Sequence, residues 1–128
     1  MAPGETIEVR LAVLQLRADG IVEIRFKPGL TTDVAGVQEV VTARRRICGS
    51  GPRRVMVVLA PDVDFELGTT TTDTAPMVAD RTVAEATVAT TALNEKLARM
   101  YYDYIRHPFP TSVHTSEAEA VAWLLQQT

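Results

Sequence analysis

Hydrophobic and polar positions alternate along the first quarter of the chain with the period of β-strands. Segments 8–17 and 21–27 are rich in aliphatic residues, and Asp19-Gly20 between them is typical of a two-residue hairpin turn. The apolar positions shift phase inside the first segment, which predicts either a β-bulge or a strand that is covered on both faces. We therefore expect the fold to open with an antiparallel hairpin.

The pattern then changes to the period of a helix. Valines recur at helical spacing from position 34 to 41, Thr32 or Asp33 can cap the start of this helix, and the segment GSGP at 49–52 ends it. The next segment, Val55–Leu59, is an unbroken apolar run of strand length. Such a run predicts a strand buried on both faces, at the centre of a parallel sheet. A short helix capped by Asp73 or Thr74 follows and ends near residue 81.

The last third of the chain predicts a strand, a helix, a short strand and a final helix. Small residues alternate with larger ones over 83–91, and Ser116-x-x-Glu119 is a capping box that begins the last helix. The helix between them, 93–107, carries an apolar stripe that we expect to face the core. The stripe consists of Leu93, Leu97, Met100, Tyr101, Tyr104 and Ile105. Tyr102 falls outside this stripe, as an ordinary surface tyrosine or as part of a self-association surface.

The elements follow the order β-β-α-β-α-β-α-β-α, so we expect one α/β domain over residues 1–128, with 1–7 as a loose tail. A hairpin followed by right-handed crossovers predicts a mixed, mainly parallel five-stranded sheet with about four helices. With 46% hydrophobic and 23% charged residues, the composition is that of a globular domain.

Charge and cysteine content narrow the expected partners and location. The formal net charge is −3, so no basic field attracts the chain to nucleic acid or to anionic lipid. No apolar run is long enough to span a membrane, and no secretory leader is evident. The single Cys48 cannot form an intramolecular disulfide, which is consistent with a reducing compartment. We expect a cytoplasmic protein that binds neither nucleic acid nor membrane.

The order of these segments resembles a known family. The resemblance depends on the run VMVVL at 55–59, the loop containing Val63, the alanine-rich segment 83–92, the helix 93–105, FPTSVHT at 109–115 and EAEAVAWL at 117–124. Together they resemble the STAS domains of sulfate transporters and anti-sigma-factor antagonists, and more closely a group of small uncharacterised bacterial STAS-like proteins. The resemblance covers about residues 8–126 and implies a STAS-like fold.

For function, the resemblance implies a protein-interaction or regulatory domain. In anti-sigma-factor antagonists, a serine or threonine that begins the helix after the central strand is phosphorylated, and this switches partner binding. The usual Asp-Ser pair is absent here. The hydroxyl groups of that segment instead belong to Thr69, Thr70, Thr71, Thr72 and Thr74. These threonines are either phospho-acceptors on an interaction surface or simple caps and loop residues.

Other clusters of polar residues favour structural roles. Asp62, Asp64 and Glu66 alternate in one loop, but the turn glycine and closing glutamate of a calcium loop are missing. His107 is expected to cap a helix end and His114 to point outward, and neither has a metal-ligating neighbour at the required spacing. The five arginines at 44–46 and 53–54 either surround a helix end and a buried strand or contact an acidic partner.

No nucleophile with its base, metal-ligand set or phosphate-binding loop is present in the sequence, so we predict neither enzymatic activity nor a cofactor nor a metal site. The expected function is a non-enzymatic regulatory domain that binds a protein partner, with a homodimer as an alternative. It would act through the short helix at 74–81 and the loop before it. The alternative function is a carrier of a small molecule or lipid, held in the room beside the small side chains of 84–92.

Overall fold

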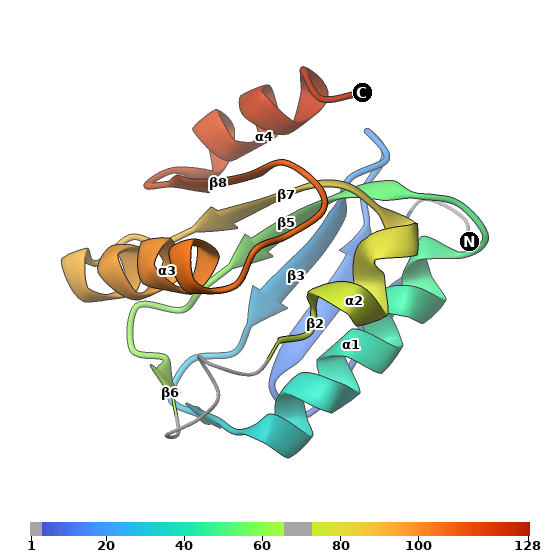
Figure 1. Ribbon diagram of the computed structural model, residues 1–128. Coiled ribbons are helices and arrows are strands. Elements are labelled where there is room, and N and C mark those ends of the chain that lie inside the picture. The colour runs from blue at the N-terminus through green and yellow to red at the C-terminus, as the bar shows by residue number, and fades with distance from the viewer. Residues whose placement is uncertain (1–3, 66–72) are drawn as a thin grey trace.

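The protein folds as a mixed sheet with helices on both faces (Figure 1). The structure is a computed structural model that describes residues 4–65 and 73–128. Six strands form the sheet in the order β1-β2-β3-β5-β7-β8. Their bounds are Thr6–Glu8 (β1), Ala12–Leu16 (β2), Val22–Phe26 (β3), Arg53–Val58 (β5), Thr82–Val88 (β7) and Thr111–His114 (β8). The pairs β1–β2 and β2–β3 are antiparallel, and the other neighbouring pairs are parallel.

Four helices accompany the sheet in the described part of the chain. Their bounds are Val34–Cys48 (α1), Ala75–Val78 (α2), Ala92–Tyr104 (α3) and Glu117–Leu125 (α4), and a 3₁₀ turn, η2, continues α2 over Ala79–Arg81. Figure 1 shows α4 on one side of the sheet and α1, α2 and α3 on the other. A separate two-stranded parallel pair is formed by β4 (Thr31–Thr32) and β6 (Asp64–Phe65). Among the described residues, no helix is both long and apolar enough to cross a bilayer.

The helices begin where the sequence supplies capping side chains. Asp33 accepts a hydrogen bond from the backbone N–H of Gly36 at the start of α1, and Ser116 accepts one from Glu119 at the start of α4. Thr91 has the same role for α3, through the N–H of Asn94. These caps fix the first turn of each helix against the end of the preceding strand or loop.

The predicted central strand is confirmed. Strand β5 lies between β3 and β7 and pairs with both in parallel, and Val55 and Met56 are fully buried. Because successive side chains of a strand point to opposite faces, each face of the sheet has its own core. Leu14, Ile24 and Val55 pack beneath α1, whereas the core on the opposite face lies beneath α4. The members of this second core include Met56, Val58, Ala84, Ala86, Ala120 and Leu124.

The prediction of a single first strand over 8–17, with a bulge or covered on both faces, is wrong. The chain reverses over residues 9–11, so that β1 and β2 form an antiparallel hairpin instead of one strand. The N–H of Val9 donates to the carbonyl of Ala12, and the N–H of Arg10 donates to the side chain of Glu39 in α1. Leu11, at the turn, is buried against α1. The phase shift in the sequence therefore marks a turn that is held by a distant helix.

This reversal also corrects the strand count and the predicted tail. The main sheet has six strands where five were expected, and residues 6 and 7 belong to β1, although 1–7 were expected to be a loose tail. The prediction of four helices and of a mixed, mainly parallel sheet agrees with the structure.

Candidate functional site

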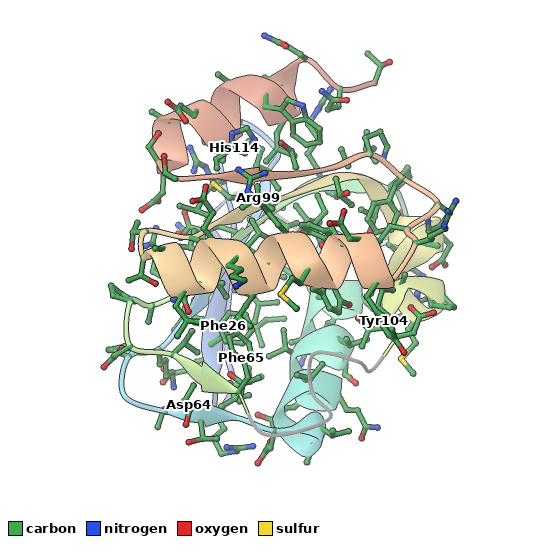
Figure 2. All side chains as sticks on the ribbon, turned by 60° about the vertical axis from the view of Figure 1, so that its left-hand side comes forward. Phe26, Asp64, Phe65, Arg99, Tyr104 and His114 are labelled. Atoms are coloured by element: carbon green, nitrogen blue, oxygen red, sulfur yellow. The ribbon has the colours of Figure 1, made fainter. Side chains whose placement is uncertain are left out.

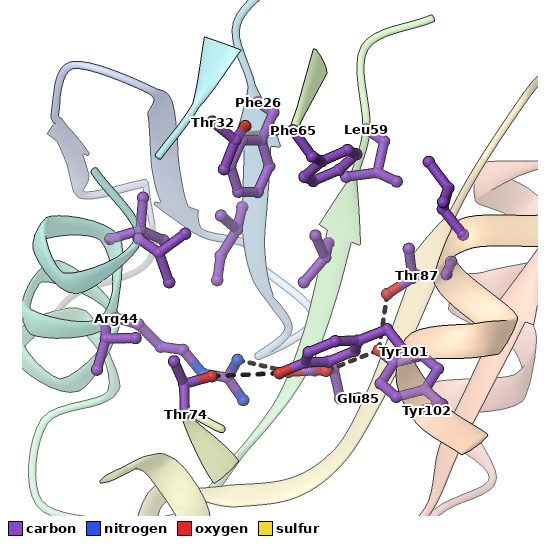
Figure 3. Close-up of a pocket in the computed structure, with 17 residues that line it drawn as sticks. Phe26, Thr32, Arg44, Leu59, Phe65, Thr74, Glu85, Thr87, Tyr101 and Tyr102 are labelled. Carbon is purple, nitrogen blue, oxygen red and sulfur yellow. Dashed lines mark hydrogen bonds and ion pairs between the residues drawn. The ribbon is translucent and has the colours of Figure 1, made fainter. Parts of the chain in front are cut away.

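A pocket of about 160 Å³ lies on the face of the sheet between α1 and α3 (Figure 3). Ile24 of β3 and Val57 of β5 contribute to the sheet side of the pocket, Val37 and Val41 of α1 line one wall, and Leu97 of α3 lines the other. Phe26, Leu59 and Phe65 also line it, and Figure 3 shows them together at one end. The lining is mostly apolar, and the pocket is partly open to solvent. A concave apolar site with a few polar groups is the usual form of a small-molecule site.

Two polar residues of the pocket, Glu85 and Thr87, lie on one face of β7 because successive side chains of a strand point to opposite faces. Ala84 and Ala86 point towards α4 and pack in the core beneath it, so Glu85 and Thr87 point to the opposite face and line the pocket. The expectation of room beside the small side chains of 84–92 therefore needs a correction, because the side of β7 that carries Ala84 and Ala86 is filled. The open space lies on the side of the strand that carries Glu85 and Thr87.

A buried ion pair joins α1 to the sheet side of the pocket. Arg44 of α1 and Glu85 are 7% and 6% exposed, and the Nη1 of Arg44 lies 2.5 Å from the Oε1 of Glu85. The other terminal nitrogen, Nη2, donates to the hydroxyl of Thr82 at 2.9 Å, and that hydroxyl donates to the carbonyl of Val78. Buried charges need this kind of paired, hydrogen-bonded arrangement, because an uncompensated buried charge is costly.

Tyr102 of α3 completes the polar network. Its hydroxyl donates to the Oε2 of Glu85 at 2.6 Å and lies 2.7 Å from the hydroxyl of Thr87, which can donate to it (Figure 3). The carboxylate therefore receives hydrogen bonds from α1 and from α3. This places Tyr102 inside the molecule, so the predictions of a surface tyrosine and of a self-association surface at this residue are wrong.

The network contains two charged groups, Arg44 and Glu85, whose opposite charges cancel. Burial disfavours ionisation of Glu85, but the positive charge of Arg44 and the hydrogen bond from Tyr102 outweigh it and hold the pKa of Glu85 below its ordinary value. Burial and the adjacent carboxylate raise the pKa of Tyr102 well above its ordinary value. Near neutral pH, the pocket therefore presents one cation, one anion and an uncharged phenol.

Two further polar groups lie at the pocket. The hydroxyl of Tyr101 is 3.4 Å from the hydroxyl of Thr74, and both residues line the pocket. Burial raises the pKa of Tyr101, so this hydroxyl also stays protonated. The Nε of Arg44 is buried and donates to no acceptor among the described residues. The site thus combines apolar walls with hydroxyl groups and a buried donor.

The predicted phospho-acceptor residues fall into two groups. Thr69, Thr70, Thr71 and Thr72 lie outside the described residues. Thr74 is described: it precedes α2, where its side chain makes no capping bond, and the first turn is instead fixed by Asp73, which accepts from the N–H of Ala75. Thr74 is therefore the one predicted acceptor for which the structure gives a position, and that position is at the pocket.

No group of three metal-ligating side chains occurs among the described residues, and Glu66 of the acidic loop lies outside them. Nδ1 of His107 lies 2.9 Å from the carbonyl of Ile105, just after α3, as expected for a residue at a helix end. His114 does not point outward as predicted. It lies against Trp123 of α4 with its Nε2 buried, and this burial lowers its pKa.

The prediction that the whole apolar stripe of α3 faces the core is wrong for three of its six residues, whereas Leu97 and Tyr101 line the pocket and Ile105 is buried. Leu93, Met100 and Tyr104 are 66%, 54% and 69% exposed, and Figure 2 shows Tyr104 on the edge of α3 that is away from β8. The helix is held instead by residues on a neighbouring face, among them Asn94, which donates to the carbonyl of Ala60 at 3.0 Å. Tyr102 lies on the same inner side as Asn94.

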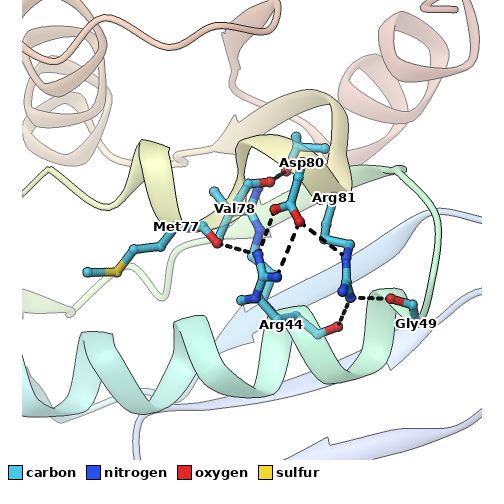
Figure 4. Close-up of polar contacts among 8 residues, drawn as sticks. Arg44, Gly49, Met77, Val78, Asp80 and Arg81 are labelled. Carbon is cyan, nitrogen blue, oxygen red and sulfur yellow. Dashed lines mark hydrogen bonds and ion pairs between the residues drawn. The ribbon is translucent and has the colours of Figure 1, made fainter.

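The arginine cluster is distributed over internal contacts. Arg45 pairs with Asp80 at 2.6 Å and donates to the carbonyl of Met77, and Arg81 donates to the carbonyl of Gly49 (Figure 4). These bonds hold α2 and η2 against the C-terminal part of α1. Two further arginines donate to backbone carbonyls, namely Arg53 to Cys48 and Arg54 to Gln127. These contacts agree with the structural interpretation for Arg44, Arg45, Arg53 and Arg54, whereas Arg46 is exposed.

Three residues of the site, Arg44, Glu85 and Tyr102, were not singled out as site residues from the sequence. One signal was present: Glu85 is a single carboxylate between alanines in a strand predicted to be inside the fold. A buried carboxylate requires a cation, and Arg44 lies in the C-terminal half of α1. The pairing itself depends on the contact of α1 with the sheet, which local patterns do not reveal.

Comparisons with known proteins place the chain in a family. No curated protein matches it significantly. Among solved structures, the chain is similar to a protein with unknown function from Arthrobacter sp. FB24, with 21% sequence identity, a TM-score of 0.32, and coverage of 87% of this chain and 90% of that chain. A family model described as "Domain of unknown function (DUF7793)" matches residues 14–128, which is most of the sequence. The chain therefore belongs to the DUF7793 family.

Proposed function

We propose that this domain is a non-enzymatic binding domain for a small, mainly apolar, uncharged molecule, which it holds in the pocket between α1 and α3. The observation that carries the proposal is the combination of apolar walls with the buried Arg44–Glu85 pair in one partly open pocket. It corresponds to the small-molecule carrier that the sequence offered as an alternative, with the ligand on the other face of β7.

The volume of the pocket supports a ligand about the size of one ring. An apolar cavity of roughly 150 Å³ is known to accommodate benzene, and the pocket here measures about 160 Å³. A long acyl chain does not fit in this space without a change in the walls. The size therefore favours a small cyclic or short branched molecule over a membrane lipid.

The electrostatics of the pocket support an uncharged ligand. The charges of Arg44 and Glu85 compensate each other, so a ligand that carries its own charge would be buried without a counter-ion. A hydroxyl or carbonyl group, in contrast, finds donors and acceptors in the hydroxyls of Tyr101 and Thr74. A neutral ring with one polar substituent matches both the walls and the polar groups.

The test is a titration of the protein with benzyl alcohol, benzoate and benzylamine, followed by NMR of the side-chain methyl groups. We expect benzyl alcohol to shift the signals of Val57, Val41 and Leu97, with a dissociation constant on the order of 0.1–1 mM, as is usual for so small a ligand. The two charged analogues should bind at least about tenfold more weakly, because each buries an unpaired charge. Equal binding of all three would contradict the proposed polarity of the site.

A pair of substitutions separates pocket binding from surface binding. Ala98 lines the pocket from α3, and Ala98→Phe should fill the space and abolish the methyl shifts. Ala122 is exposed on α4, on the opposite side of the sheet, so Ala122→Phe is the matched control and should leave binding unchanged. Binding that survives Ala98→Phe would show that the ligand lies elsewhere, and the proposal would fail.

A second candidate is the regulatory, protein-binding function that the STAS-like resemblance implies, in the cytoplasm and under control of a kinase. What supports it is the position of Thr74, whose hydroxyl lies next to that of Tyr101 at the pocket. A phosphate on Thr74 would bring about two negative charges to this point and would change what the pocket and α2 can bind. Mass spectrometry of protein isolated from its own cells tests this candidate. Phosphate on Thr74 supports it, and unmodified threonines throughout 69–74 count against it.

A further inference from the structure

Helix α3 presents an apolar ridge to solvent. Leu93, Leu97, Met100 and Tyr104 recur at intervals of four, three and four residues, which is the spacing of one seam of a two-helix coiled coil. Leu97 is half-buried, and the other three are more than half exposed. The 13 residues of α3 form a rod of about 20 Å, long enough for a short helix pair. Large apolar side chains gathered on one surface helix are typical of an interaction site.

The ridge is complementary to itself. If two copies of α3 pack antiparallel about a two-fold axis between Leu97 and Met100, then Leu93 of each copy meets Tyr104 of the other, and Leu97 meets Met100. Each layer of such a seam then contains one aliphatic side chain opposite a larger, flexible or aromatic one. Interdigitation of large with smaller side chains is the arrangement that packs well between helices.

Two charged residues beside the ridge, Lys96 and Asp103, are also placed to favour the antiparallel pair. Lys96 and Asp103 are both exposed and flank the ridge on one side, seven residues apart, in equivalent positions of the seam. In the antiparallel pair, Lys96 of each copy faces Asp103 of the other copy, which gives two oppositely charged pairs related by the two-fold axis. Neither residue forms an ion pair with another described residue of its own chain.

We propose that the protein forms a symmetric dimer in solution through antiparallel packing of α3 against α3, with Lys96 of each subunit paired with Asp103 of the other. This interface is separate from the ion pair and hydroxyl groups of the pocket, which lie on the inner side of α3. Figure 2 shows Tyr104, at one end of the ridge, on the edge of the helix opposite to Arg99. The dimer thus uses mainly the exposed side of α3, and the half-buried Leu97 belongs both to the ridge and to the pocket wall.

The interface is small, so its affinity is modest. A seam of about three helical turns falls in the lower size class of protein interfaces, where association is weak or transient. We expect a dissociation constant in the micromolar range, which sedimentation experiments can resolve. Because the two charged pairs are exposed, added salt should weaken the dimer further.

The test is sedimentation equilibrium of the full chain over roughly 1 μM to 1 mM, at low salt. The wild type should show a monomer–dimer equilibrium. Lys96→Asp places two aspartates opposite each other, and Asp103→Lys does the same with two lysines, so each should weaken the dimer by roughly 5-fold to 30-fold. The double variant, Lys96→Asp with Asp103→Lys, reverses both partners and should restore the wild-type constant.

Met100→Lys provides a second, independent variant. Its side chain is more than half exposed, so the monomer should keep its fold, as circular dichroism can verify, whereas a lysine at the centre of the seam should abolish the dimer. The proposal is overturned if the wild type stays monomeric over the whole range. It is also overturned if a dimer forms but responds to none of these substitutions, because the interface then lies on another surface.

Discussion

The buried ion pair between Arg44 and Glu85 gives the sharpest prediction about stability. Arg44→Met keeps most of the volume of the side chain but removes the charge, so the carboxylate of Glu85 remains buried without its cation. Breaking a buried pair from one side typically costs about 3–5 kcal/mol. We therefore expect the free energy of unfolding to fall by about 3–5 kcal/mol, which is a large part of the stability of a small domain.

The neighbouring arginine supplies a matched control. Arg45 also forms an ion pair, with Asp80, but that pair is largely exposed. Exposed pairs usually contribute about 0.2–1 kcal/mol, so Arg45→Met should cost no more than about 1 kcal/mol. Two arginine-to-methionine changes at adjacent positions of one helix should thus differ severalfold in effect, because only one of them leaves a buried charge behind.

Urea unfolding of a double-mutant cycle measures the coupling directly. The double variant, Arg44→Met with Glu85→Met, removes both charges and should be more stable than Arg44→Met alone, since no unpaired charge remains. The coupling energy between the two positions should be at least about 2 kcal/mol. If the two single costs simply add in the double variant, the residues do not interact, and the reasoning about the pocket electrostatics is refuted.

The same pair makes stability depend on pH. Because the pKa of Glu85 in the folded protein is held below its ordinary value of 4.5, ionised Glu85 stabilises the fold above about pH 4.5 and loses this contribution as the pH falls through the folded-state pKa. The difference in unfolding free energy between the wild type and Glu85→Gln should therefore shrink as the pH is lowered from 7 towards acid. A difference that stays constant over this range would show that Glu85 is not ionised in the native state.

Three further predictions concern single positions and are measured by urea or thermal unfolding. Gly36→Ala should destabilise by about 1–2 kcal/mol although alanine favours helix, because the added Cβ overlaps the side chain of Leu11, and a gain in stability would show that α1 can move away from the β1–β2 turn. Asn94→Ala should cost about 1–3 kcal/mol, since it leaves the buried carbonyl of Ala60 without its donor, and a neutral result would mean that water replaces the bond. Leu93→Ser should change stability by less than about 0.5 kcal/mol, because this side chain is largely exposed, and a loss of several kcal/mol would place it in the core instead.

Local patterns were sufficient for the elements of the fold that are held by local forces. The unbroken apolar run Val55–Leu59 predicted the central strand because a strand covered on both faces needs apolar side chains at successive positions, and four of these five residues are buried. The pair Thr32 or Asp33, of which Asp33 is the cap, and Ser116 predicted two helix starts, because the capping bonds connect residues three positions apart. For these two caps, the partner of the interaction lies within the same short segment of sequence, and for the strand the apolar run itself is the signal.

The turn between β1 and β2 shows why other parts could not be predicted. Residues 9–11 contain no glycine or proline, so no local turn signal is present. The turn is fixed by Glu39 of α1, which accepts from the N–H of Arg10, and by the close approach of Gly36 to Leu11. These contacts bring together residues about thirty positions apart, and only the folded chain makes them visible.

Helix α3 shows the same difficulty for the candidate site. Residue type favours Leu93, Met100 and Tyr104 for the core, yet the structure buries Asn94 and the hydroxyl of Tyr102. Polar side chains can be buried when they form hydrogen bonds inside the fold, here with the carbonyl of Ala60 and the carboxylate of Glu85. Those partners lie on other elements, so hydrophobic periodicity alone misses these buried polar residues and assigns three exposed side chains to the core.

The most direct test of the proposed binding function is a crystal structure of the protein soaked with benzyl alcohol. The account predicts electron density for the ring between Val57, Val41 and Leu97, with the alcohol oxygen within hydrogen-bond distance of Tyr101, Thr74 or the Arg44–Glu85 pair. An empty pocket at saturating ligand, or a ring bound only outside α1 and α3, would contradict it.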